Sequence, residues 1–387
     1  MKSRSAAKTF TPGLLAFAVA HAFAAPPAPT ALPTGGTVTG GVAGIAQNGA
    51  RMDINQTSAR AILEWQSFDI GSAAQVNFAQ PAASSIALNR VLAGDASQIM
   101  GRLTANGQVY LVNPNGVIFG AGSSADVGGL VASTLDIKDA DFMAGRNIFN
   151  RNGATGKVIN RGALNAADGG LVALLTPEAR NEGIISARLG NVVLAAGERI
   201  TLDAGADGRL RVAVDPATID TLVENRQMIV ADGGQVVMTA KAADRHYSAV
   251  VANTGSVQAR TIENHDGRIL LLADMDHGET RVGGTLDASA PATPSPLAGE
   301  GRGEGATANG GFVETSAAKV NVADDARVTT LAANGKTGAW LIDPNDYTIA
   351  ASGGNIPVRN SLLTSTAATS PSARPRRGRQ AATATSS

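Results

Sequence analysis

The stretch Asn106–Gly120, with the sequence NGQVYLVNPNGVIFG, contains the strongest fold signal in this chain. Two short β-branched and aromatic runs, Val109–Val112 and Val117–Phe119, have the composition of β-strands. Between them lies Asn113–Gly116, in which proline presets φ, the asparagines can bond their own backbone and glycine supplies conformational freedom. The pattern predicts two strands joined by a tight hairpin or corner.

The bulk composition favours stacked short strands over a helical enzyme. The 387 residues include 45 Gly, whereas aromatic residues make up 4% and charged residues 17%. Cysteine is absent, so packing and backbone hydrogen bonds, not disulfides, must stabilise the fold. Three basic residues precede residue 9 and four follow residue 373, so the remaining 25 face 32 acidic residues and the middle carries −7. This mildly acidic middle argues against nucleic acid as a partner.

Residues 1–24 have the layout of a signal peptide. A basic start precedes the apolar run Leu14–Ala20, which is too short to span a bilayer, and Ala22–Ala24 forms an A-x-A cleavage site. We therefore expect Sec-dependent export with cleavage after Ala24. The Pro/Ala-rich residues 25–34 that follow are interpreted as a linker.

An internal repeat appears after residue 157. The template N-x-G-x-[LIV]-x-A begins at Asn160, Asn181 and Asn253, and a degenerate copy begins at Gly283. The first two copies are 21 residues apart, the length of one coil of a parallel β-solenoid, in which each coil covers the apolar face of the next. We expect the template asparagines to stack as a hydrogen-bonded ladder and the glycines to occupy left-handed bends.

The pattern predicts an all-β fold, a right-handed parallel β-helix. Antiparallel strands over Thr37–Val76 are expected to cap its open N-terminal end. An immunoglobulin-like sandwich would explain the strand lengths but not the recurring template. Residues 281–350 are expected to form further coils, with a low-complexity insertion at 291–305, and the Ser/Thr/Ala/Arg-rich residues 361–387 are expected to be disordered.

Three segments in sequence order carry a family resemblance: Ile86–Val91, Ser97–Gly107 and Asn106–Gly120. They closely resemble the N-terminal secretion domain of the filamentous-haemagglutinin-like exoproteins, the secreted partners of two-partner secretion systems. The resemblance is close over residues 33–200 and continues as a repeat pattern beyond them. It implies that residues 35–280 form the secretion (haemagglutinin activity) domain.

The resemblance also implies a route and a partner. The chain would cross the periplasm, bind the soluble repeats of a cognate outer-membrane transporter by β-augmentation, and fold at the bacterial cell surface. The residues implied in transporter recognition are Asn113, Pro114, Asn115 and Gly116. Family members often carry a second Asn-Pro turn upstream, where Asn89 of this chain is followed by arginine, so Asn89 is a secondary candidate.

The function implied is that of a secreted adhesin-like or haemagglutinin-like exoprotein, monomeric, with a host or neighbouring cell surface as its further partner. A β-helical polysaccharide-degrading enzyme is one rival, but no strand face carries clustered carboxylates. A truncated remnant is the other, because Gly338–Ile349 resembles a segment that precedes a long passenger. We predict no enzymatic activity, cofactor or metal, since the spacing of His246, His265 and His277 matches no ligand pattern.

Overall fold

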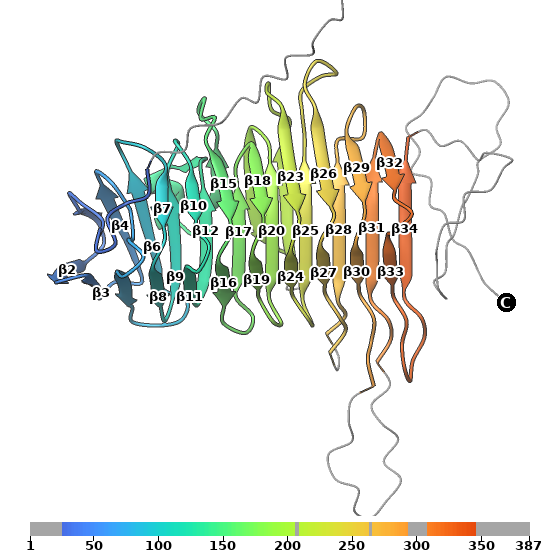
Figure 1. Ribbon diagram of the computed structural model, residues 1–387, viewed down its shortest axis with the longest axis horizontal. Helices are drawn as coiled ribbons and strands as arrows, with labels where there is room; N and C mark the ends of the chain where they lie inside the picture. The colour runs from blue at the N-terminus through green and yellow to red at the C-terminus, as the bar shows by residue number, and fades with distance from the viewer. Residues whose placement is uncertain (1–24, 206–208, 263–264, 293–307, 346–387) are drawn as a thin grey trace, which may run out of the picture.

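The computed structural model describes residues 25–205, 209–262, 265–292 and 308–345. In these ranges the regular structure consists of 34 strands and one short helix, α1 (Asp139–Met143), stacked along one long axis (Figure 1). The all-β prediction is confirmed. In the same ranges no helix combines the length and the apolar character needed to span a bilayer.

Three sheets run along the stack, and most coils contribute one strand to each. In spatial order, the first sheet contains β1 (Thr37–Gly40), β4 (Arg60–Trp65), β6 (Ile86–Val91), β9 (Gln108–Val112), β12 (Gly129–Ser133), β17 (Leu171–Leu175), β20 (Asn191–Ala196), β25 (Gln235–Ala240), β28 (Arg268–Ala273), β31 (Phe312–Ala317) and β34 (Ala339–Pro344). The second sheet contains β7 (Ser97–Ile99), β10 (Val117–Phe119), β15 (Lys157–Asn160), β18 (Glu178–Asn181), β23 (Thr221–Asn225), β26 (Ala249–Asn253), β29 (Glu279–Val282) and β32 (Lys319–Val322). The third sheet contains β2 (Ala43–Asn48), β3 (Arg51–Gln56), β5 (Gln75–Ala79), β8 (Arg102–Ala105), β11 (Ser124–Val127), β16 (Ala163–Ala166), β19 (Ile184–Ser186), β24 (Met228–Val230), β27 (Ser256–Gln258), β30 (Thr285–Asp287) and β33 (Arg327–Thr329).

Strands of successive coils pair in parallel, which confirms the solenoid. Asn160 lies in register with Asn181, so the 21-residue repeat is one coil. Alternate residues of each strand, such as Val109 and Leu111, fill one continuous interior. Each coil therefore buries the apolar face that its neighbour leaves uncovered.

The antiparallel cap is shorter than predicted. In the described part of the three long sheets only β1 on β4 and β2 on β3 pair in this way, so the cap comprises Thr37–Asn48. From β3 onward the pairing is parallel, with Arg51 opposite Gln75. Alternating apolar and polar residues bury one face of a strand whether the strand pairs in parallel or antiparallel. The alternating residues between Met52 and Phe78 therefore could not show where antiparallel pairing changes to parallel pairing.

Residues 25–34 are not a linker. They pack along the first coil: Leu32 is buried in the core, and the Ala31 and Pro29 carbonyl oxygens accept hydrogen bonds from Gly71 N (2.9 Å) and Ala73 N (2.8 Å). A β-carbon on Gly71 would lie 2.1 Å from the Ala28 oxygen, so glycine permits this close approach. The Pro/Ala composition resembles that of a linker because such side chains give no strand alternation.

A fourth, antiparallel sheet covers part of the outer face of the first sheet and was not predicted. It contains β13 (Asp136–Ile137), β14 (Asn147–Asn150), β21 (Arg199–Ala204) and β22 (Leu210–Asp215). With Phe142 of α1 it encloses a second apolar core against the outward residues of β9, β12, β17 and β20. Those strands are buried on both faces, which explains their nearly continuous apolar sequences.

The three sheets continue past residue 280 as far as β34, β32 and β33, with no interruption at that position. The predicted signal peptide (1–24) and disordered tail (361–387) lie outside the described residues, as does nearly all of the predicted insertion at 291–305.

Candidate functional site

Asn113–Gly116 forms a corner and not a hairpin, because β9 and β10 belong to different sheets. Gly116 N donates to the Asn113 carbonyl oxygen (3.0 Å), and Asn115 N donates to Asn113 Oδ1 (2.9 Å). Gly116 has φ +125°, a conformation that side-chain-bearing residues rarely adopt. The turn predicted from the sequence is therefore present, but only Asn113 bonds the local backbone, because the Asn115 side chain bonds Gly94 of the preceding coil.

Asn113 ties three coils together from inside the corner. Its side chain has no exposed surface, and Nδ2 donates to the Asp95 carbonyl oxygen and to Ser97 Oγ of the preceding coil, both at 3.0 Å. Its backbone N–H donates to the Ser133 carbonyl oxygen of the following coil (2.9 Å). In the folded domain Asn113 shapes the corner but offers no surface to a partner.

Pro114 and Asn115 form the exposed part of the corner. Asn115 Nδ2 donates to the Gly94 carbonyl oxygen at 2.9 Å, which holds the side chain against the loop of the preceding coil. In that loop Leu92 is 61% exposed. A folded-state partner at this corner would meet Pro114 and Asn115, with an exposed leucine in the adjoining loop.

Asn89 lies in a different place. It is buried in β6, where Oδ1 accepts from Trp65 Nε1 (3.0 Å) and Nδ2 donates to the Tyr110 carbonyl oxygen (3.3 Å). The following residue, Arg90, points outward and holds the strand β13 that precedes α1, donating to Asp136 Oδ1 (2.9 Å). Asn89 therefore accepts the indole hydrogen bond of the buried Trp65, and the fold does not bring the Asn89 side chain to the exposed corner.

The predicted asparagine ladder is present in the second sheet. Asn160 Nδ2 donates to Asn181 Oδ1 (2.8 Å), Asn181 Nδ2 to Asn225 Oδ1 (2.8 Å), and Asn225 Nδ2 to Asn253 Oδ1 (2.7 Å). All four side chains are fully buried. Asn225 was missed because Gln227 stands where the template requires glycine; relaxing that one position would have revealed it.

The reason given for the template glycines was wrong. Gly162, Gly183 and Gly255 are not in the left-handed region; among the template glycines only Gly284 is, at φ +57°. A β-carbon on Gly183 would lie 2.2 Å from the Gly162 carbonyl oxygen. These positions require glycine because the backbones of stacked coils approach closely there.

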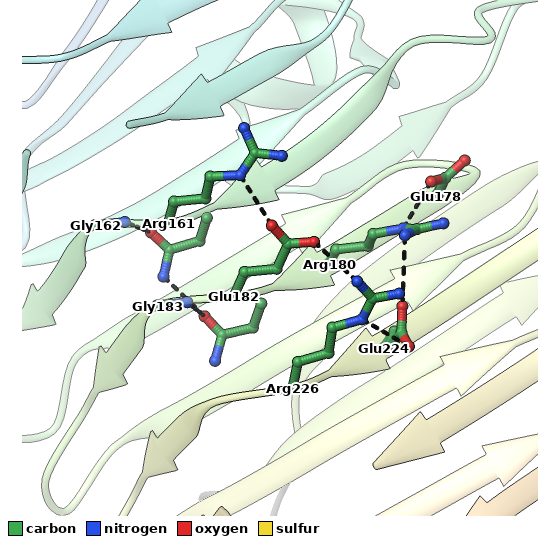
Figure 2. A network of polar contacts seen from close by, with 10 residues as sticks. Arg161, Gly162, Glu178, Arg180, Glu182, Gly183, Glu224 and Arg226 are labelled. Carbon is green, nitrogen blue, oxygen red and sulfur yellow. Dashed lines mark hydrogen bonds and ion pairs between the residues drawn. The ribbon is translucent and has the colours of Figure 1, made fainter. Parts of the chain in front are cut away.

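The outer face of the second sheet carries a row of ion pairs beside the ladder (Figure 2). Glu182 accepts from Arg161 Nε (2.9 Å) and from Arg226 Nη1 (3.3 Å), so it links three successive coils. Arg226 also bonds Glu224 Oε1 (2.9 Å), and this hydrogen bond raises the pKa of Arg226 above its usual value. The acidic and basic groups of this row neutralise one another, so it does not form a basic surface suited to nucleic acid.

In the described ranges no group of three or more His, Asp or Glu side chains converges on a possible ion site. His246 pairs with Asp244, with Nδ1 2.9 Å from Oδ1, and both side chains are largely exposed.

A parallel β-helix with an antiparallel cap, an antiparallel layer over one face and an Asn-Pro-Asn-Gly corner in its early coils defines a class of bacterial secretion modules. The TPS secretion domain family matches residues 30–286, and this chain belongs to that family. The match spans the cap, the corner and the asparagine ladder.

Two heme/hemopexin-binding proteins of Haemophilus influenzae are similar in sequence. The first, from strain Rd, is 38% identical over 252 residues, which are 63% of this chain and 27% of the relative. The second is 34% identical over 248 residues, covering 58% of this chain and 26% of the relative. The chain thus matches about a quarter of the length of these relatives.

The crystal structure of the HMW1 secretion domain from Haemophilus influenzae has a similar fold. It superposes with a TM-score of 0.56 at 24% identity, covering 80% of this chain and all of that domain. At this level of identity the likeness concerns the fold alone.

Proposed function

We propose that residues 35–280 act as the export module of a two-partner secretion exoprotein. In this proposal a Sec signal at 1–24 delivers the chain to the periplasm, where a cognate outer-membrane transporter recognises it and passes it to the cell surface. The observation that carries the proposal is the family match over residues 30–286, which includes the cap and the corner.

We further propose that Asn113–Gly116 contacts the transporter. Support comes from the division of the corner: Asn113 is buried and bonded to the preceding coil, while Pro114 and Asn115 are exposed. In the periplasm, before folding, the transporter meets this segment as an extended chain, and Asn89 is accessible there as well. No catalytic step is part of the proposal.

Co-expression of the full chain with and without the transporter tests the export module. We expect the transporter to be required for release into the medium, and mass spectrometry of the released protein to give Ala25 as the first residue. Equal release without the transporter, or a released chain that begins at Met1, would contradict the proposal.

For the exoprotein as a whole we propose adhesion to a host or neighbouring cell surface. A second candidate is binding of heme or hemopexin, which is favoured by the names of the two similar proteins from Haemophilus influenzae. Titration of the purified exoprotein with hemopexin, beside a cell-binding assay, separates the two. Saturable hemopexin binding without cell binding would replace the adhesin proposal.

A further inference from the structure

The fourth sheet stops partway along the outer face of the first sheet. Its last strand, β22, pairs with β21 on one side only, and no strand in the described ranges pairs with its other edge. Val214 belongs to the second core, and Leu210 and Val212 pack against that core, toward the first sheet. Arg211, Ala213 and Asp215 alternate with them and are exposed.

The free edge of β22 carries backbone groups directed away from β21. The Leu210 carbonyl oxygen accepts a hydrogen bond from Gln235 Nε2 (3.0 Å), a residue of the first sheet. Backbone groups alternate in direction along a strand, so the N–H and C=O groups of Val212 and Val214 face the same way. They form the kind of edge to which an extended chain adds.

The surface beside this edge is apolar for the width of one strand. β22 lies over β20 and β25, and the next strand of the first sheet is β28. The outward residues Leu270 and Leu272 of β28 are partly exposed, and Leu270 extends the second core. One strand further, Glu314 and Ser316 lie in register with them, so the apolar surface ends.

We propose that an extended segment of a partner protein binds along β22 and adds a fifth strand to the fourth sheet. Neighbouring strands are about 4.8 Å apart in both sheets, so a strand added beside β22 lies over β28. Backbone hydrogen bonds to Val212 and Val214 hold the segment. Apolar side chains at alternate positions cover Leu270 and Leu272, which selects segments with a period-2 apolar pattern.

A second copy of this domain does not fit the site through its own β22. The copy's β22 is already packed on its own first sheet, and that sheet would have to occupy the place of β28, β31 and β34, through which the first sheet continues (Figure 1). A single extended segment brings no such sheet. The geometry therefore points to a linear peptide segment as the occupant.

The test uses a fluorescent synthetic peptide that copies residues 198–205. This segment contains β21, which already pairs with β22 and directs Ile200 and Leu202 toward the first sheet. Titration with the full chain is expected to show saturable binding in fluorescence anisotropy, and a scrambled peptide is expected not to bind. Amide exchange at Val212 and Val214 should slow on binding. No saturable binding up to about 1 mM would overturn the proposal.

Two variants locate the binding. Leu270→Asp places a charge on the apolar strip, and Val212→Pro removes a donor that does not bond β21; each should weaken binding by about tenfold or more. Ile184→Asp, at an exposed position of the third sheet, should leave it unchanged. If melting shows that Leu270→Asp is unfolded, Leu270→Ser takes its place. Unchanged affinity in both edge variants, or protection of amides elsewhere, would overturn the assignment.

Discussion

Buried asparagines fasten neighbouring coils at the corner and in the ladder, but the two regions differ in what else they present. Asn113 is a single residue that bonds Asp95 and Ser97 of the preceding coil, and it is followed by two exposed residues. The ladder from Asn160 to Asn253 repeats one contact through four coils and exposes none of its side chains. The ladder therefore serves stability, whereas the corner can serve both stability and recognition.

The largest stability effect is expected in the ladder. Asn181→Leu would remove one of the two acceptors of Asn160 Nδ2, which would keep only the Ile184 carbonyl oxygen, and would leave Asn225 Oδ1 without its donor. Buried groups left in this state should lower the free energy of unfolding by about 2–5 kcal/mol in urea titrations. Asn165→Ala is the control, since its partly buried side chain bonds only Asp126 among the described contacts, and it should cost about 1 kcal/mol or less. Equal losses would refute the structural role of the ladder.

The second prediction concerns pH and the layer that covers the coils near the corner. Burial against the fourth sheet raises the pKa of Tyr110 to about 12, whereas an unfolded tyrosine titrates near pH 10. Below pH 10 both states keep the proton; above it the unfolded state loses the proton first. Stability should therefore fall by about 1.4 kcal/mol per pH unit between pH 10 and 12. In unfolding titrations at these pH values Tyr110→Phe should lack this loss, and identical slopes would contradict burial of the phenol.

A smaller effect is expected where stacked backbones touch. Gly183→Ala puts a β-carbon 2.2 Å from the Gly162 carbonyl oxygen, so the coils must separate locally. We expect a loss of roughly 1–3 kcal/mol in thermal or urea unfolding. At Gly44 a β-carbon would meet no atom within 4 Å, so Gly44→Ala should be near neutral. A tolerated Gly183→Ala would mean that the coils are more loosely stacked than described.

The sequence predicted what repeats and what depends on local turn chemistry. The ladder through Asn181 followed from one 21-residue period, and the corner at Gly116 followed from its tetrapeptide. The partners of Asn113 could not be predicted, because Asp95 lies in an irregular loop and Ser97 begins the three-residue strand β7, neither of which follows the template. The fourth sheet was missed because β14 pairs with β21, although β15 to β20 of the other three sheets lie between these two strands in the sequence. Apolar runs such as Leu171–Leu175 did indicate strands buried on both faces.

Transporter recognition at the corner is tested most directly by comparing export with stability for variants of its exposed half. Asn115→Ala removes one exposed hydrogen bond to Gly94, so its melting temperature should stay close to that of the wild type. Gly116→Val also strains the backbone, by roughly 1–3 kcal/mol, so it reports on both roles. Asn55→Ala, at an exposed position of β3, is the matched control.

The measurement is the amount of each variant released when it is co-expressed with the transporter, set against the melting temperature of the refolded protein. We expect Asn115→Ala to lose export while keeping its melting temperature, and Asn55→Ala to keep both. Normal export of Asn115→Ala and Gly116→Val, or export that merely follows melting temperature across all three variants, would contradict transporter recognition at this corner.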